Sequence, residues 1–546
     1  MSNLKVACVQ ISAYDLAHAE AGLLHALEMI DVAGQGGAEL IVLPECTYPA
    51  YFLRGESEYA QAGLRSWNEI IALFGDKARE HGCHLVVGLA HRGEDACCLL
   101  NAAILFGPDG EIIGSTNKSF LWHFDQRWFK PGKQYEVFDT SIGRIGLIVC
   151  ADGRMPEIAR ILALQGAQVI VDPTAWVTSG GDRATLSNPQ FEYMIPVRAL
   201  ENGAWFVVAN KVGLEANTIL YCGRSCVIDP AGNKVVAAGA DREEVVFCDI
   251  DISQATGTPV RRKPEMYATI AQPTEDQPAA RLMREKVVPE QTVVRVAAFQ
   301  LADYTSVAAY WSRVEELVDT VSRQDVRLVV LPGTVPADAD GDAIKSNETL
   351  GHLAGLSATF GCGIAATLNE YDGAYRYRTC FLWDAGKLVG KYRKAHPDAG
   401  YVAGNELAVF DTSFGRLGIM LDEEGLLPEV ARCLMLKGAD TILWPSRPFD
   451  WPLPMVARSR ADENKVHVVL ATAMGPSLNQ VAKEGRMGKG TAIINPGGAI
   501  VAAALPDVEQ VIAVQVVWAL SRYKEMAPNT NVVWSRMPET YEALVK

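Results

Sequence analysis

Leu40-Ile41-Val42-Leu43-Pro44 occurs a second time as Leu328-Val329-Val330-Leu331-Pro332, and this repetition reveals how the chain is organised. Each stretch is preceded by an apolar run that ends in glutamine, Gln10 or Gln300, and by a helical stretch. Further matching pairs follow in the same order: Gly110 and Gly386, Asp139 and Asp411, Glu157 and Glu429, Asn202 and Asn464, and Met266 and Met526. The offset between partners drifts only from 290 to 260, which chance does not explain. The chain therefore contains two copies of one domain.

The length of 546 residues fits two such domains. We expect the first over residues 1–270 and the second over residues 292–546. Residues 271–291 contain three prolines and charges of both signs, which predicts a connector or an extended arm.

Short apolar runs alternate with helical periodicity in each copy. Residues 40–43, 85–89 and 145–150 have the composition of buried strands. Between such runs lie apolar stripes with helical spacing; one comprises Leu23, Leu24, Leu27, Met29 and Ile30. The alternation predicts an α/β fold with mostly buried sheets.

Composition excludes several classes of partner. Fifty Lys and Arg residues face 65 Asp and Glu residues, and the net charge of -15 argues against nucleic acid or an anionic membrane surface as a main partner. The start of the chain does not read as a signal peptide, and no apolar run is long enough for a transmembrane helix. Twelve cysteines, including the adjacent Cys97 and Cys98, follow no disulfide or zinc spacing. We expect a cytoplasmic protein with free thiols, no metal and no organic cofactor.

Three chemically useful residues follow separate predicted strands of the first copy: Glu45, Lys118 and Cys150. A thiol attacks a carbonyl group well only after it is deprotonated, and a nearby carboxylate can take its proton. A fixed ammonium group can stabilise the oxyanion that forms. Taken singly, Cys150 also suits a buried apolar position, and Glu45 and Lys118 also suit a structural ion pair.

These residues, followed by Cys150-Ala151-Asp152-Gly153-Arg154-Met155-Pro156-Glu157, resemble the nitrilase (carbon–nitrogen hydrolase) superfamily once per copy over essentially the whole chain. The resemblance implies tandem four-layer αββα sandwich domains and a Glu-Lys-Cys catalytic set. By position, Glu45 resembles the general base, Lys118 the oxyanion-stabilising lysine and Cys150 the nucleophile. The backbone N–H of Ala151 would complete the oxyanion hole.

Asp125 stands seven residues before Gly132, where many members of the superfamily have a glutamate. The shorter side chain leaves open whether this acid positions Lys118, positions the attacking water or only caps a turn.

Three further residues are candidates for substrate binding. Arg154 suits either a substrate carboxylate or a pair with Glu157 on the same turn. Tyr51 and Trp176 suit either the wall of a pocket or the aromatic core.

The second copy lacks the catalytic residues. Gly333 stands where the first copy has Glu45, and Asp422 stands where it has Cys150. Lys394 matches Lys118, whereas the position of Asp125 falls on Pro397. We therefore predict an inactive second domain. Because superfamily members form dimers with an interface close to the active site, we expect it to act as an intrachain pseudo-dimer partner, with further homo-oligomers open.

The expected reaction is hydrolysis of a non-peptide C–N bond in a small linear amide or N-carbamoyl compound through a cysteine thioester. A nitrilase that acts through a thioimidate is the nearest alternative, but nitrile-cleaving relatives have Trp-Glu after the nucleophile, where this chain has Ala151-Asp152. Acyl transfer and a non-enzymatic binding or scaffold role stay open. The substrate stays open as well, because Arg154 and a polar loop at residues 178–189 do not define a pocket.

Overall fold

The computed structural model describes residues 3–93, 99–178, 180–287, 293–304, 306–333, 343–474, 490–505 and 508–546. Cys97 and Cys98 lie outside these residues, and so does the end of the predicted connector, residues 288–291. The chain divides into two compact units. Unit 1 comprises Met1–Pro259 and Ala527–Thr530, and unit 2 comprises Val260–Met526 and Asn531–Lys546. Over the described residues, no helix is long and apolar enough to cross a membrane.

Unit 1 contains two β-sheets that pack face to face. The first has the order β11-β10-β1-β2-β3-β4-β5, and β14 also pairs with β1. Its strands are β1 (Asn3–Ser12), β2 (Leu40–Val42), β3 (His84–Arg92), β4 (Leu99–Phe106), β5 (Ile112–Asn117), β10 (Lys211–Glu215), β11 (Ile219–Cys222) and β14 (Glu244–Asp251). The second has the order β13-β12-β9-β8-β7-β6. Its strands are β6 (Val137–Thr140), β7 (Gly143–Leu147), β8 (Val169–Pro173), β9 (Trp205–Ala209), β12 (Cys226–Ile228) and β13 (Lys234–Ala237).

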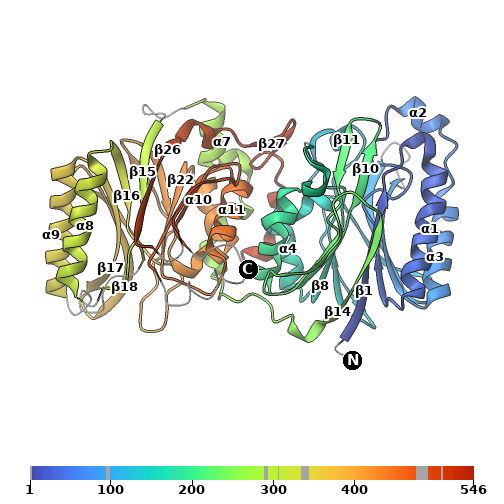
Figure 1. Cartoon of the computed structure of the whole chain (residues 1–546), viewed down its shortest axis with the longest axis horizontal. Coiled ribbons are helices and arrows are strands. Elements are labelled where there is room, and N and C mark those ends of the chain that lie inside the picture. Colours follow the sequence, from blue (N-terminus) through green and yellow to red (C-terminus); the bar gives the residue numbers. More distant parts are fainter. Residues whose placement is uncertain are drawn as a thin grey trace. The chain divides into compact units, whose positions relative to one another are not determined.

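Helices cover the outer face of each sheet of unit 1 (Figure 1). α1 (Ala19–Gln35) and α3 (Trp67–His81) pack on the first sheet, and α5 (Ile195–Asn202), beside α4 (Pro156–Leu164), packs on the second. The short α2 (Glu56–Gln61) precedes α3. The apolar stripe of α1 explains this packing, because Leu23, Leu27 and Ile30 are buried in the core while Leu24 is 51% exposed. The layers of unit 1 are therefore α, β, β and α.

The strand expected at residues 145–150 is shorter than its apolar run. β7 ends at Leu147, and a 3-10 turn begins at Cys150. The cause is Asp152, whose Oδ2 accepts the N–H of Val149 at 3.1 Å and turns the backbone out of the strand. Cys150 consequently lies in a turn rather than at the last position of a strand.

Unit 2 repeats the same layers. Its first sheet has the order β19-β18-β17-β16-β15-β26, and its second has the order β20-β21-β22-β23-β24-β25. The first comprises β15 (Val293–Gln300), β16 (Val326–Val330), β17 (Gly363–Asp372), β18 (Tyr375–Asp384), β19 (Lys387–Arg393) and β26 (Gln510–Val517). The second comprises β20 (Val409–Thr412), β21 (Gly415–Ile419), β22 (Thr441–Ser446), β23 (His467–Thr472), β24 (Ala492–Ile494) and β25 (Ile500–Ala503).

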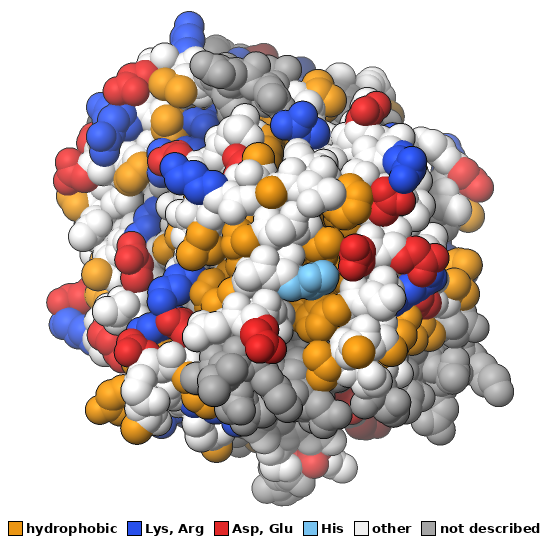
Figure 2. Space-filling view, turned by 90° about the vertical axis from the view of Figure 1, so that its left-hand side faces the viewer, with side chains coloured by type: hydrophobic (Ala, Val, Ile, Leu, Met, Phe, Trp, Pro, Cys, Tyr) orange, Lys and Arg blue, Asp and Glu red, His pale blue; other side chains and the backbone are white. Residues whose placement is uncertain are grey.

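α8 (Val307–Ser322) and α9 (Ala343–Phe360) pack on the first sheet of unit 2, and α10 (Pro428–Leu436) and α11 (Leu453–Asn464) on the second (Figure 1). The prediction of two αββα sandwich domains in tandem is thereby confirmed. The face drawn in Figure 2 shows apolar side chains near its centre, with basic and acidic side chains interspersed around them.

The segment predicted as a connector is partly helical and belongs to unit 2. It contains α7 (Pro278–Arg284), which packs against α10. Ala279 and Ala280 on this helix are buried. Their burial gives a physical reason for the helix, because small apolar side chains allow it to lie close to its neighbour.

Candidate active site

Lys118 lies between two carboxylates in the interior of unit 1. Its Nζ is 2.7 Å from Oε1 of Glu45 and 2.7 Å from Oδ2 of Asp125, and all three side chains are fully buried. Asn101, on β4, donates its side-chain amide to the same Glu45 oxygen at 2.6 Å. The other oxygens, Glu45 Oε2 and Asp125 Oδ1, have no hydrogen-bond partner among the described residues. Each carboxylate thus holds the ammonium group with one oxygen, and the Asp125 carboxyl also interacts with the Tyr51 side chain.

Burial and charge act in opposite directions on the two central groups. Burial disfavours a charged Lys118, but the negative charges of Asp125 and Glu45 outweigh it and raise the pKa of Lys118 well above its usual value. Burial and the charge of Glu45 raise the pKa of the Cys150 thiol well above its usual value, although Lys118 opposes this. The site therefore holds a permanent ammonium group beside a protonated thiol, and the thiol needs a base before it can react.

Cys150 has a left-handed backbone conformation, with φ of 52°. Its N–H donates to Oδ1 of Asp172, at the end of β8, at 2.6 Å. Its carbonyl oxygen accepts a hydrogen bond from Nε2 of Gln190 at 2.7 Å. A residue with a β-carbon seldom adopts this conformation unless its surroundings hold it there.

Asp152 ties the Cys150 turn to the segment that follows Lys118. Its Oδ1 accepts the backbone N–H groups of Ser119 at 3.0 Å and Phe120 at 2.7 Å. Burial raises the pKa of Asp152 to about 6, while these backbone hydrogen bonds oppose the rise. One buried carboxylate thereby fixes the relative positions of the lysine and the thiol.

The loop that follows Glu45 is held at both ends by β10. Nζ of Lys211 donates to the carbonyl oxygen of Cys46 at 2.9 Å, and Oε1 of Glu215 accepts the N–H of Phe52 at 2.7 Å. The two β10 side chains lie 3.7 Å apart and are buried. This ion pair fixes the loop that carries Tyr51.

Of the three predicted substrate-binding residues, the structure brings Tyr51 next to Lys118. The Lys118 Nζ lies 5.6 Å from the centroid of the Tyr51 ring. Burial, together with the charges of Asp125 and Glu45, raises the pKa of Tyr51 well above its usual value, so the phenol stays protonated.

Arg154 and Trp176 have other surroundings. The Arg154 guanidinium is buried over the ring of Trp122, 4.5 Å from its centroid, and Nε donates to Oε1 of Gln190 at 3.1 Å. Trp176 is buried with its backbone N–H on the side chain of Asn210. Its indole Nε1 has no hydrogen-bond partner in the part of the chain that the structure describes.

The turn that carries Asp125 is also contacted by residues from far along the sequence. This turn, η2 (His123–Arg127), donates the N–H of His123 to Oγ1 of Thr530 at 2.7 Å. Nε2 of Gln126 donates to the carbonyl oxygen of Asn529 at 2.7 Å. Residues Ala527–Thr530 are part of unit 1, so these contacts complete the turn within that unit.

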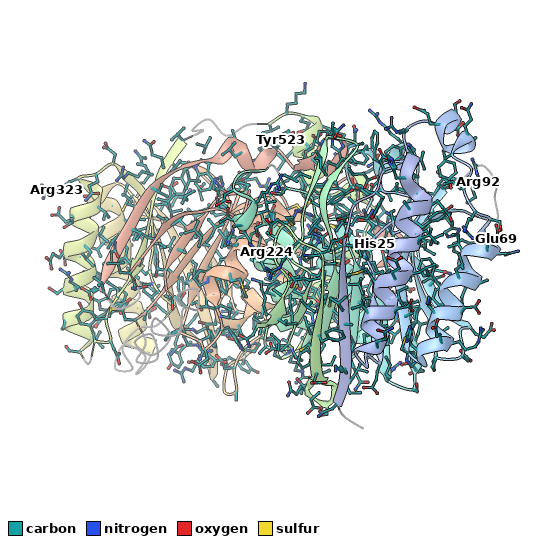
Figure 3. All side chains as sticks on the ribbon, turned by 45° about the vertical axis from the view of Figure 1, so that its right-hand side comes forward. His25, Glu69, Arg92, Arg224, Arg323 and Tyr523 are labelled. Atoms are coloured by element: carbon teal, nitrogen blue, oxygen red, sulfur yellow. The ribbon has the colours of Figure 1, made fainter. Side chains whose placement is uncertain are left out.

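Arg224 donates two hydrogen bonds to the polar loop that the sequence analysis placed at residues 178–189. Arg224, labelled in Figure 3, donates Nε to the carbonyl oxygen of Leu186 at 3.0 Å and Nη2 to that of Ala184 at 2.9 Å. Its two hydrogen bonds give it a structural role in this loop.

A cavity of about 400 Å³ lies elsewhere in unit 1, lined by Tyr48, Tyr59, Trp67, His91 and Arg92, among others. Arg92 is labelled in Figure 3. Neither Glu45 nor Cys150 lines this cavity.

Asp31, Glu80 and His81 are the group whose geometry could hold a metal ion, as far as the described residues go. Nζ of Lys77 already lies 2.7 Å from Oδ2 of Asp31 and 3.0 Å from Oε2 of Glu80. A metal ion would have to compete there with the Lys77 ammonium group, so we assign no metal to these three residues.

Sequence reasoning missed Asn101, Asp172 and Gln190. Asn101 and Asp172 interrupt the apolar runs of β4 and β8, and a polar residue inside a buried run is a detectable signal. Gln190 lies in a π-helical turn, Gln190–Met194. Such turns are frequent at functional sites, but no simple sequence pattern marks them.

The corresponding region of unit 2 has a different chemistry. Asp422 has the same φ of 52° as Cys150 and is buried. Its carboxylate lies 3.4 Å from Nζ of Lys394 and 3.5 Å from Nε of Arg378. Burial opposes ionisation, but Arg378, Lys394 and Arg447 together lower the pKa of Asp422. An ion cluster thus occupies the place of the thiol.

Gly333 shows why the base is also absent from unit 2. Its N–H donates to the carbonyl oxygen of Ser446 at 3.1 Å, as the Glu45 N–H does to Thr174 at 3.2 Å in unit 1. A β-carbon on Gly333 would meet the backbone C of Ser446 at 2.7 Å and its Cα at 2.9 Å. Beside Pro397, where the second acid is missing, Asp398 contacts Lys394 at 3.5 Å.

Comparison with known proteins supplies independent findings. The family model described as carbon–nitrogen hydrolase matches residues 5–260 and 295–523. A nitrilase from Pyrococcus abyssi is 33% identical over 46% of this chain and 90% of its own length. The omega-amidase NIT2-B from Xenopus laevis is 30% identical over 42% of this chain and 82% of its own length. A citrullinase from Francisella tularensis is 28% identical over 50% of this chain and 99% of its own length. Among solved structures, an amidase from Nesterenkonia sp. is 24% identical, with a TM-score of 0.39 over 52% of this chain and 96% of that chain.

Proposed function

This chain belongs to the carbon–nitrogen hydrolase family and is a cysteine-dependent hydrolase of amide-type C–N bonds; from that premise we propose that unit 1 cleaves a small linear amide or N-carbamoyl compound through a thioester on Cys150. The observation that carries the proposal is the pair of carboxylates around Lys118, of which Glu45 has one oxygen held and the other without a hydrogen-bond partner among the described residues.

Glu45 is the general base of the proposed reaction. Because Oε1 is held by Lys118 and Asn101, the open Oε2 takes the proton of the Cys150 thiol. The thiolate attacks the carbonyl carbon, and the oxyanion is bound by the Lys118 ammonium group and the N–H of Ala151. Collapse of this intermediate breaks the C–N bond, and Glu45 returns the proton to the departing ammonia or amine.

The second half of the reaction frees the acid. Water gives a proton to Glu45 and attacks the thioester, and the thiol leaves with that proton. Asp125 positions Lys118 through Oδ2, which also accepts the N–H of Trp122 at 2.8 Å. The Asp125 carboxylate reaches the lysine directly despite its shorter side chain, and this contact supports the proposed role.

The proposed substrate class rests on the relatives. Two of them are named for amide or ureide cleavage, an omega-amidase and a citrullinase, and both bond types place an NH₂ group on the scissile carbonyl. Buried acceptor oxygens of Glu45 and Asp125 suit such N–H donors.

The test is intact-protein mass after rapid mixing with a panel of small amides, ureides and nitriles. We expect an acyl adduct on the peptide that contains Cys150, together with release of ammonia from an amide or ureide. Cys150→Ala should abolish both, and Cys248→Ser, at a partly exposed thiol on β14, should change neither. Turnover of nitriles alone would favour the thioimidate reaction, and full activity of Cys150→Ala would overturn the proposal.

A further inference from the structure

The direction of the Cys150 thiol depends on an unusual backbone. At φ of 52° the residue sits in the left-handed region, which side chains with a β-carbon rarely adopt. The backbone angles set the direction of the Cα–Cβ bond, and therefore where the sulfur can lie. Contacts that hold the backbone N–H and carbonyl group of Cys150 consequently control the approach of the thiol to a substrate carbonyl group.

Asp172 holds the backbone N–H of Cys150. It lies on β8, is fully buried, and accepts the Cys150 N–H on Oδ1 at 2.6 Å. Its other oxygen has no hydrogen-bond partner within the described ranges. Burial raises the pKa of Asp172 well above its usual value, and the hydrogen bond from Cys150 opposes that rise.

Gln190 holds the carbonyl end. Its Nε2 donates to the Cys150 carbonyl oxygen at 2.7 Å, and its Oε1 accepts from Nε of Arg154 at 3.1 Å. The backbone N–H of Gln190 is bound by Oδ1 of Asn188 at 2.9 Å. The side chain therefore has a fixed orientation, with its donor directed at Cys150.

Unit 2 supplies an internal comparison. The same left-handed turn occurs at Asp422, where Trp444 takes the place of Asp172 and donates its indole N–H to the Asp422 carbonyl oxygen at 2.8 Å. Unit 2 thus holds the carbonyl end of the turn from the position at which unit 1 holds the N–H end. The side-chain acceptor for the N–H stands at this position in the unit that has the thiol.

We propose that Asp172 and Gln190 are positioning residues. They hold the backbone N–H and the carbonyl group of Cys150 and so direct its thiol at the substrate. The inference rests on the proposed role of Cys150 as nucleophile. It also assigns the oxyanion to Lys118 and the Ala151 N–H, because the Cys150 N–H is already bound to Asp172.

The test uses the full chain and pairs of variants with similar side-chain shape. Asp172→Asn keeps an oxygen acceptor for the Cys150 N–H, whereas Asp172→Leu removes it; Gln190→Leu removes the donor to the carbonyl. We expect the kcat and KM of Asp172→Asn to stay close to those of the parent protein. We expect Asp172→Leu and Gln190→Leu to lower kcat on the order of 100-fold with little change in KM, since a displaced nucleophile costs about that much.

A second readout does not depend on the substrate. The rate of alkylation of Cys150 by iodoacetamide, followed by peptide mass, should fall in parallel with kcat. Trp444→Phe is the control in unit 2, because it removes the hydrogen bond to the Asp422 carbonyl oxygen, the counterpart of the Gln190 bond to Cys150, and should leave the alkylation rate unchanged.

The outcomes separate positioning from folding and from the proposed function. Parent-like kcat and alkylation in Asp172→Leu and Gln190→Leu overturn the inference, as does a loss that only matches the folded fraction in melting curves. A parent protein without an acyl adduct overturns the proposed function, while the alkylation series still tests how the thiol is held.

Discussion

Cys150 shares its burial with several cysteines that have no assigned role. Burial raises the pKa of the Cys150 thiol well above its usual value, and burial likewise raises the pKa of Cys226 to about 12. Cys226 differs from Cys150 in its neighbours, because the charges that act on it belong to Lys234 and Asp172. Cys150 has the carboxylate of Glu45 and the ammonium group of Lys118 acting on it, as Cys46 also has. A base next to a protonated thiol is the arrangement that nucleophilic catalysis needs.

The buried thiols should make the protein sensitive to alkali. The pKa of Cys226 is raised from about 9 to about 12 by burial, so above pH 9 the unfolded chain loses a proton that the folded chain keeps. Its stabilising contribution is complete below pH 9 and is lost as the pH rises towards 12. Relative to Cys226→Ala, the parent protein should lose about 1.4 kcal/mol of unfolding free energy between pH 8 and pH 10.

Urea unfolding at both pH values measures this loss. Cys248→Ala is the control, because Cys248 is less buried and its contribution should change less. Parallel pH profiles for the parent protein and Cys226→Ala would contradict the prediction.

The turn after β7 and its counterpart after β21 are alike in backbone, with φ of 52° at Cys150 and at Asp422. They differ in what surrounds them, since unit 2 closes the space of the base around Gly333. The second copy therefore differs from the first at these positions in packing as well as in residue type.

We predict that Gly333→Ala destabilises unit 2 by about 1–3 kcal/mol, the usual cost of overpacking, because the new β-carbon meets the backbone of Ser446. Thermal and urea unfolding measure this. Gly351→Ala is the matched control: Gly351 lies in α9 with nothing within 4 Å of an added β-carbon, so it should stabilise by about 0.5–1 kcal/mol. A Gly333→Ala protein as stable as the parent would refute the packing argument.

At this scale, motif order was enough to predict much of the site. The sequence places Glu45, Lys118 and Cys150 after three separate strands, and strand ends in such folds gather in one region. Lys118 and Glu45 are indeed 2.7 Å apart. Apolar periodicity predicted an α/β fold with mostly buried sheets, and the four-layer αββα arrangement came from the family resemblance.

The contacts that cross between elements were not predictable in this way. Asp172 reaches Cys150 from β8, and Asn101 reaches Glu45 from β4. Such pairs depend on the register of neighbouring strands and on side-chain rotamers, which a single sequence does not specify. The end of β7 was misplaced for a similar reason, since the Asp152 side chain accepts the N–H of Val149 and interrupts the apolar run.

The two copies differ in the residues of the candidate active site. The expectation that they associate as a pseudo-dimer stays a prediction. What the structure adds is that unit 1 is not one continuous stretch of chain, because Ala527–Thr530 belongs to it. A protein ending at residue 275 therefore lacks two acceptors for the turn that carries Asp125, namely Thr530 Oγ1 and the Asn529 carbonyl oxygen.

We predict that Thr530→Val in the full chain lowers kcat about fivefold, because a lost hydrogen bond worth about 1 kcal/mol loosens the turn behind Asp125. A protein of residues 1–275 should lose at least as much. Steady-state kinetics on the amide found above measures both. Thr140→Val, which removes a hydrogen bond on β6 of the same unit, should leave kcat unchanged. Full activity of the shortened protein would refute the requirement for residues 527–530.

This discontinuity has a consequence during synthesis. Ala527 is translated 268 residues after Pro259. At roughly 5–20 residues per second, the ribosome needs about 13 to 54 s to cover that distance. Throughout that interval the emerged amino-terminal half already contains the lysine, the base and the thiol, yet the turn behind Asp125 still lacks its two acceptors. The full catalytic rate should therefore be reached late in translation, when the nascent chain is nearly complete.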